Sequence, residues 1–138
     1  MAVRLNPYIA FSDGKARAAM EFYQSVFGGK LDINTFGDFG APDPGLADKV
    51  MHALLVTEGD LALMGADTPP GMEHVRGNNI AISLSGDDGD TLRGWWAKLS
   101  EGGTISTPLE KQMWGDEFGT CTDQFGTEWM VNITAPQP

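Results

Sequence analysis

The chain has 138 residues, with 19 acidic and nine basic side chains that give a formal net charge of −10. This length suits one domain with a moderate core, and the apolar stretches are too short to cross a bilayer, which takes about 20 residues. The excess of carboxylates repels phosphate backbones and anionic lipid headgroups. The first residues also show no signal-peptide pattern. We therefore expect a cytoplasmic protein that binds neither nucleic acid nor membranes.

The first elements in chain order are a strand and a helix. Residues 3–11 alternate as a strand does, and this pattern places four residues on one face: Leu5, Pro7, Ile9 and Phe11. Ser12-Asp13-Gly14 then predicts a helix cap. The apolar stripe of the helix consists of Ala16, Met20, Tyr23 and Phe27, and the helix is expected to end at Gly28-Gly29.

Three further strands complete the first half. Residues 30–36 predict a strand, and 37–48 form the longest irregular stretch, rich in glycine and proline and suited to a loop or lid. Residues 50–56 and 61–64 flank a short turn and predict a hairpin, with Asp67 at the end of its second strand.

The second half repeats this plan. A break at 67–71 precedes a strand at 78–84, a helix that follows Asp87-Asp88-Gly89-Asp90, and strands near 104–110, 117–122 and 127–133. The segment 94–106 also repeats 20–33: each is a helix end, a double glycine and a strand start. The acidic segment 87–90 has neither the Gly-Lys-Ser/Thr end of a phosphate loop nor calcium-loop spacing, which favours a plain turn.

The duplication predicts one α+β domain over 1–138, built from two βαβββ modules at about 1–67 and 76–138. We expect a curled mixed sheet around a central cleft, with the helices on the outer face. A pair of ferredoxin-like βαββ repeats is the alternative architecture. Trp129 is expected in the core beneath a helix because it alternates with Glu128 and Met130. Cys121 is the one cysteine in the sequence, which excludes an intramolecular disulfide. Its place within a predicted strand favours a buried structural thiol over a nucleophile.

Several segments together resemble one protein family. Asn6-Pro7-Tyr8-Ile9-Ala10-Phe11, Ala19-Met20-Glu21-Phe22-Tyr23, Phe27-Gly28-Gly29, Met51-His52-Ala53-Leu54-Leu55 and Ala62-Leu63-Met64-Gly65-Ala66-Asp67 occur in the first half; the second half holds Gly115-Asp116-Glu117-Phe118-Gly119 and 123–132. Their order along nearly the whole chain resembles the PhnB-like branch of the vicinal oxygen chelate, or glyoxalase/bleomycin-resistance, superfamily. The resemblance implies a homodimer and a small-molecule cleft.

The same resemblance bears on metal binding. The metal enzymes of the superfamily hold their ion on four strands, at positions that correspond here to Pro7, Met64, Asn79 and Met130. Only Asn79 offers an oxygen donor, and thioethers suit Cu(I) rather than a hard divalent ion. We therefore expect no metal site and no cofactor. The alternative is a divalent metal at His52 and Asp67, which two ligands would leave mostly bound to water.

The expected ligand site is a mostly apolar cleft with few polar groups. Its lining is Pro7, Ile9, His52, Leu54, Met64, Asn79, Trp114 and Met130. His52 is either a core histidine or the acid–base group of the cleft, where the resemblance places a histidine. Trp114 either covers one end of the core or forms a wall of the pocket.

Three functions are compatible with this site. The first is a metal-independent protein that binds a small organic ligand, as antibiotic-sequestering proteins do. The second is a lyase, isomerase or dioxygenase that uses a metal or His52. The third is a non-catalytic accessory protein whose surface binds another protein.

Overall fold

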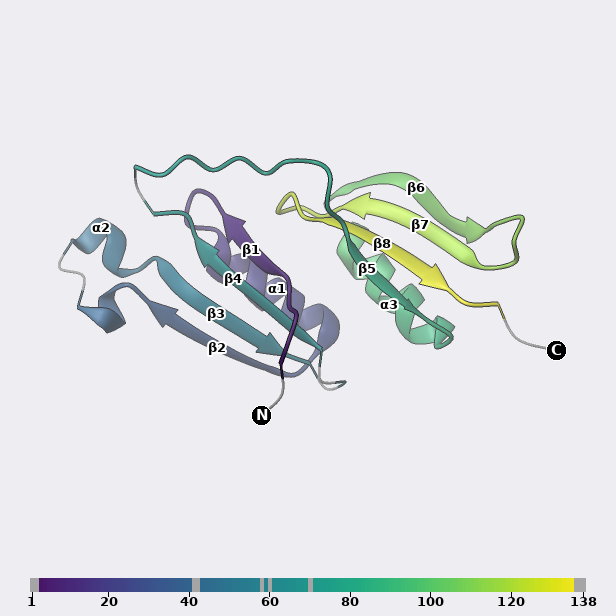
Figure 1. Ribbon diagram of the computed structural model, residues 1–138, viewed down its shortest axis with the longest axis horizontal. Coiled ribbons are helices and arrows are strands. Elements are labelled where there is room, and N and C mark those ends of the chain that lie inside the picture. The colour runs from purple at the N-terminus through teal and green to yellow at the C-terminus, as the bar shows by residue number, and fades with distance from the viewer. Residues whose placement is uncertain (1–2, 41–42, 58, 60, 70, 136–138) are drawn as a thin grey trace. The chain divides into compact units, whose positions relative to one another are not determined.

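The computed structural model describes residues 3–40, 43–57, 59, 61–69 and 71–135, which form two compact units, 1–76 and 77–138 (Figure 1). The first unit contains β1 (Tyr8–Phe11), α1 (Ala16–Phe27), β2 (Lys30–Thr35), the 3-10 helix η1 (Gly37–Phe39), α2 (Pro44–Ala47), β3 (Val50–Val56) and β4 (Ala62–Asp67). The second contains β5 (Ile82–Gly86), α3 (Gly89–Ser100), β6 (Thr104–Lys111), β7 (Glu117–Thr122) and β8 (Glu128–Ile133). None of these helices is long and apolar enough to span a membrane.

Both units have the same topology. The strand orders are β1-β4-β3-β2 and β5-β8-β7-β6. In each sheet the first strand pairs in parallel with the last, and the other neighbours are antiparallel. The predicted α+β class and tandem βαβββ plan are confirmed. The ferredoxin-like alternative is wrong, because three strands follow the helix in each unit.

Each helix covers one face of its own sheet (Figure 1). The buried side of α1 consists of Ala16, Ala19, Met20, Tyr23 and Val26, whereas Phe27, which the stripe predicted, is only partly buried. In the second unit α3 buries Leu92, Trp96 and Leu99. Trp129 is 2% exposed and donates to Asp123 Oδ2 at 2.8 Å, so its predicted core position is confirmed, as is the burial of Cys121.

The repeated double glycine has a steric reason. A Cβ on Gly29 would lie 2.1 Å from the Val56 carbonyl oxygen, and a Cβ on Gly103 would lie 2.1 Å from that of Thr122. No side chain fits at these distances, because backbone atoms cannot move aside as a flexible side chain does. The second glycine of each pair therefore lets the chain leave the helix and start a strand directly against a neighbouring strand.

The cap of α1 comes from a distant residue. The helix begins after Lys15, whose side chain caps nothing, and the predicted Ser12-Asp13-Gly14 side-chain cap is wrong. Instead Asp67, at the end of β4, accepts from the backbone N–H of Ala16 at 2.9 Å and from that of Val50 at 2.8 Å. One buried carboxylate thus joins the start of α1 to the start of β3.

Three predicted segments differ from the observed elements. The strand expected over 3–11 is confined to β1, and Val3 and Leu5 are almost fully exposed. Likewise the strand expected over 78–84 begins only at Ile82, and Ile80 is exposed. Alternation marked both runs as strands, but among the described residues the strand pairing takes in only 8–11 of the first run and 82–84 of the second. The irregular stretch at 37–48 contains η1 and α2.

Candidate functional site

The strand register of the first unit assembles a row of four side chains on the sheet face opposite α1. Asp32 on β2 pairs with Leu54 on β3, Leu54 pairs with Met64 on β4, and Met64 pairs with Tyr8 on β1. Directly paired residues project to the same face of a sheet. The neighbouring residues Ala53, Leu55 and Leu63 are buried on the α1 side. We call the surface that carries the row, together with His52 and Asn34, the open face of the first unit.

Polar groups surround the apolar centre of this face. The partly buried His52 is paired in register with Asn34, and its ring centroid lies 6.0 Å from that of Tyr8, at an interplanar angle of 45°. Asn6 points its Nδ2 toward Met64 Sδ at 3.8 Å. Leu54 and Met64 are partly buried, while Tyr8 is 54% exposed. An apolar floor with an imidazole, a phenol and an amide nearby is the composition of a small-molecule site.

One predicted lining residue of this unit lies on the other face of the sheet, and another lies just before the first strand. Ile9 pairs with Gly65, and a Cβ on Gly65 would touch Met20 of α1, so Ile9 belongs to the helix-covered face. Pro7 precedes β1, and its carbonyl accepts from the Met64 N–H at 3.0 Å. The register therefore brings His52, Leu54 and Met64 together and replaces Ile9 with Tyr8. The sequence already indicated this sidedness: Ile9 and Phe11 alternate onto one face of β1, and this more apolar face is the one that packs against the helix.

The second unit presents an equivalent face opposite α3. Met130 pairs with Thr120, and Asn132 pairs with Phe118, so these four side chains share it. Asn132 donates to Asp116 Oδ2 at 3.0 Å, and this bond is the main cause that lowers the pKa of Asp116. Trp114 lies in the β6–β7 turn, 60% exposed, with its ring 6.3 Å from that of Phe118. The predicted lining residues Trp114 and Met130 thus occur on or beside this face.

Asn79 lies apart from the strand on which it was expected. It is exposed and precedes Ile82, the first residue of β5, by three positions. Of the four positions that correspond to metal ligands in the superfamily's metal enzymes, Asn79 was the one with a hard oxygen donor. The structure describes it outside any regular element.

The alternative pair of metal ligands, His52 and Asp67, is separated by the sheet. His52 lies on the open face, whereas Asp67 is 4% exposed and uses both carboxylate oxygens to accept backbone N–H groups. Within the described ranges, no three His, Cys, Asp or Glu side chains lie close enough together to hold an ion. Asp67 is thus a structural carboxylate at the end of β4, and it does not pair with His52.

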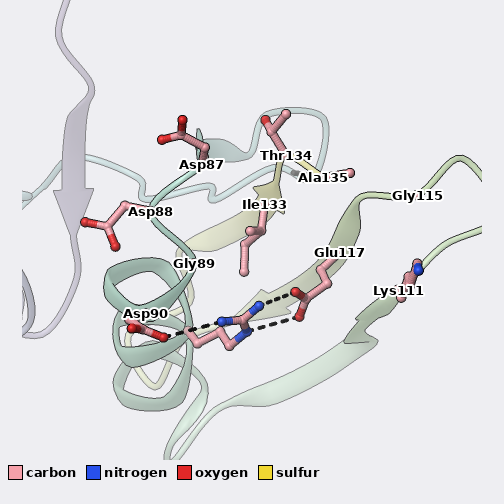
Figure 2. Close-up of a pocket in the computed structure, with 11 residues that line it drawn as sticks. Asp87, Asp88, Gly89, Asp90, Lys111, Gly115, Glu117, Ile133, Thr134 and Ala135 are labelled. Atoms are coloured by element: carbon pink, nitrogen blue, oxygen red, sulfur yellow. Dashed lines mark hydrogen bonds and ion pairs between the residues drawn. The ribbon is translucent and has the colours of Figure 1, made fainter. Parts of the chain in front are cut away.

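A hollow of about 780 Å³ lies in the second unit where α3 begins (Figure 2). Asp88 caps α3 by accepting from the Thr91 N–H and hydroxyl, which lowers the pKa of Asp88. Arg93 donates two hydrogen bonds to Glu117 and also pairs with Asp90, and the hydrogen bond from Arg93 lowers the pKa of Glu117. These charged groups therefore serve the helix cap and the contact between α3 and β7. The turn predicted at 87–90 holds only for Asp87 and Asp88, because Gly89 and Asp90 already belong to α3.

Comparison with known proteins gives consistent matches along the chain. The sequence model of the Glyoxalase/Bleomycin resistance protein/Dioxygenase superfamily matches residues 6–131. Protein YjdN of Escherichia coli is 25% identical over 97% of both chains, and the uncharacterized protein Mb0911c of Mycobacterium bovis is 30% identical over 92% of this chain and 80% of its own.

Solved structures agree with these sequence matches. Protein PA1353 from Pseudomonas aeruginosa has a TM-score of 0.87 and 35% identity, covering 98% of this chain and 100% of its own. The PhnB protein from Bacillus cereus has a TM-score of 0.77 over 96% of this chain and 100% of its own, and at 22% identity it shows a common fold. The expected resemblance is confirmed: the chain belongs to the glyoxalase/bleomycin resistance protein/dioxygenase superfamily.

Proposed function

We propose that this protein binds a small organic ligand on the open face of the first unit and does so without a metal ion. The observation that carries the proposal is the register that places Met64 and Leu54 next to Tyr8, whose ring lies 6.0 Å from that of His52, on a face that α1 leaves open. A partly buried apolar floor next to an aromatic ring and a few polar groups favours a ligand with both apolar and hydrogen-bonding parts. Membership of a superfamily that includes bleomycin resistance proteins supports a binding role.

The donor set argues against a hard divalent cation at the superfamily's usual position. Pro7 has no side-chain donor, Met64 offers a thioether already approached by the Asn6 amide, and Met130 offers a second thioether. Divalent magnesium, manganese and iron select carboxylate, carbonyl and imidazole ligands. These residues therefore do not fit such an ion, and the proposed function routes no step through one.

A thermal-shift screen tests the proposal. Purified protein is heated with a library of small aromatic and aliphatic compounds, and hits are tested again with Tyr8→Ala and His52→Ala. Both variants should weaken binding, because each removes a wall of the proposed site. Phe39→Ala is the matched control: Phe39 is an exposed aromatic of the same unit, but it lies in η1, outside the sheet. Hits that respond to Phe39→Ala and not to Tyr8→Ala would contradict the proposed site.

The same screen separates binding from the accessory role. A protein that only docks on another protein has no reason to respond to small compounds. Silence across the library would therefore favour the accessory role over ligand binding. The expected homodimer stays a prediction, which light scattering of the purified protein tests.

A second candidate function is proton transfer by His52. It is a partly buried imidazole on the open face, and imidazole is the side chain that most often serves as a general acid or base. A bound ligand with an acidic C–H would then exchange that hydrogen for deuterium in heavy water. NMR of each hit follows this exchange, which should disappear in His52→Gln while binding persists. Exchange that is as fast with His52→Gln would exclude His52 as the base.

A further inference from the structure

We propose that the ligand of the open face is an elongated organic cation, with its apolar end at Tyr8 and its positive group at Asp32. This inference rests on the proposed function and adds the chemical class and orientation of the ligand. It comes from the order of side chains across the four strands, which is aromatic, thioether, aliphatic and carboxylate: Tyr8, Met64, Leu54 and Asp32.

The row has a defined length. Its four residues lie on β1, β4, β3 and β2, which are successive neighbours in the sheet. Adjacent strands are about 4.8 Å apart, so three steps separate the backbones of Tyr8 and Asp32 by about 14 Å. A compact ligand cannot contact both ends at once. A ligand with an aromatic end, an apolar middle and a polar end placed several bonds away matches all four side chains.

The charge at the far end selects a cation. Asp32 carries the carboxylate of the row, and its side chain is 60% exposed. Its charged neighbour on β2 is Lys30, whose Nζ lies 4.0 Å from Asp32 Oδ1 and whose side chain is 82% exposed. A pair this long and this exposed contributes little, so a ligand ammonium can compete with Lys30 for the carboxylate. The net charge of −10 also raises the local concentration of cations.

The Tyr8 end suits the uncharged part of the ligand. Tyr8 as a whole is 54% exposed, and its ring lies beside that of His52, so a second ring can stack on it. The two middle residues, Leu54 and Met64, offer only apolar contacts to the chain that joins the two ends. Reversing the ligand would place a positive group near His52 and lose the contact with Asp32.

The test uses ω-phenylalkylamines of increasing chain length and the matched phenylalkyl alcohols, with dissociation constants from calorimetry. The amines should bind more tightly than the alcohols, with the largest ratio at the chain length that reaches from Tyr8 to Asp32. Asp32→Asn should lower amine affinity by about twofold to fivefold and leave alcohol affinity unchanged, because an exposed ion pair has that strength. Lys30→Gln should raise amine affinity, because it removes the competing cation.

The control removes the same charge from the other side of the unit. Glu21→Gln changes an exposed carboxylate on α1, so any loss that it shares with Asp32→Asn reflects net charge alone. An amine-to-alcohol ratio that is unaltered in both Asp32→Asn and Lys30→Gln would overturn the cation inference. If alcohols and amines bind equally and both depend on Tyr8, the cation inference fails and the proposed function stands. Failure of the whole library to bind would overturn both.

Discussion

The substitution Asp67→Asn tests whether one buried carboxylate holds the first unit together. Asp67 is 4% exposed and accepts the N–H groups of Ala16 and Val50, at 2.9 and 2.8 Å through separate oxygens. Asparagine keeps the shape but replaces one oxygen with an NH₂ group. One backbone N–H then faces a donor, and both it and the NH₂ group lose a partner inside the protein.

The cost follows from those two contacts. A hydrogen bond to a charged group contributes about 1.5–3 kcal/mol, and a buried donor left without a partner adds to the loss, so we expect the free energy of unfolding to fall by about 2–4 kcal/mol. For a chain of this length about 3–4 °C of Tm corresponds to each kcal/mol, which predicts a drop near 10 °C. Urea and thermal unfolding followed by far-UV circular dichroism measure both quantities.

The control is Asp48→Asn, which makes the same change at an exposed position after α2. It should alter stability by less than about 0.5 kcal/mol. Equal stabilities of the two variants would refute the structural role of Asp67. A chelator should leave the difference between wild type and Asp67→Asn unchanged, whereas a difference that vanishes with chelator would show that Asp67 binds a metal ion.

Three further predictions concern the second unit. Gly103→Ala should lower the free energy of unfolding by more than about 2 kcal/mol, because the added Cβ meets the Thr122 carbonyl. Gly94→Ala places its Cβ in open space on α3 and should raise the free energy of unfolding by about 0.5–1 kcal/mol. Equal effects of the two substitutions in urea unfolding would contradict this prediction. Burial raises the pKa of Cys121 to about 11, so iodoacetamide should alkylate the native thiol far more slowly than the unfolded thiol at pH 8, as measured by mass spectrometry. The free energy of unfolding should also decline as pH rises from about 8.5 toward 11, because the unfolded thiol loses its proton first. Equal alkylation rates would refute the burial of Cys121. The lowered pKa of Asp116 stabilises the fold at pH values above the ordinary pKa of a carboxyl group, and this contribution is lost as the pH falls through the pKa of Asp116 in the folded protein. The Tm difference between wild type and Asp116→Ala should therefore shrink in acid. A Tm difference that stays constant would contradict the hydrogen-bonding role of Asp116.

The sequence predicted the topology because the decisive signals are local. The double glycines at 28–29 and 102–103 mark equivalent positions in the two units, and the structure shows why each second glycine is needed. Alternation placed Trp129 in the core because the period of a strand is two. Such patterns depend on residues a few positions apart, which the sequence displays directly.

The cap of α1 depends on a residue far along the chain. Ser12 and Asp13 form a credible cap in sequence, but the carboxylate that accepts the first helical N–H comes from Asp67, 51 positions beyond Ala16. Local capping rules cannot identify a partner that only tertiary folding brings near. Because Asp67 uses its carboxylate oxygens for backbone N–H groups, it is also a poor candidate for a metal ligand.

Sidedness was the hardest part of the site to predict. His52, Leu54 and Met64 were placed together correctly, but the sequence prediction assigned Ile9 to them where the register puts Tyr8. A shift of one residue exchanges the two faces of a strand, and β1 is only four residues long. The sequence prediction did not place Asp32 on this face, because its position beside Leu54 depends on the pairing of β2 with β3, which the sequence does not reveal.

Methionine-methyl NMR tests the central claim most directly. The protein is labelled with ¹³C at the methionine methyl groups and titrated with a compound from the thermal-shift screen. Met64 lies on the open face, while Met20 projects from α1 and is buried against the other face of the same sheet. Ligand binding on the open face should shift the Met64 resonance and leave that of Met20 in place. A titration that shifts Met20, or methionines elsewhere, and leaves Met64 unmoved would contradict the proposed site.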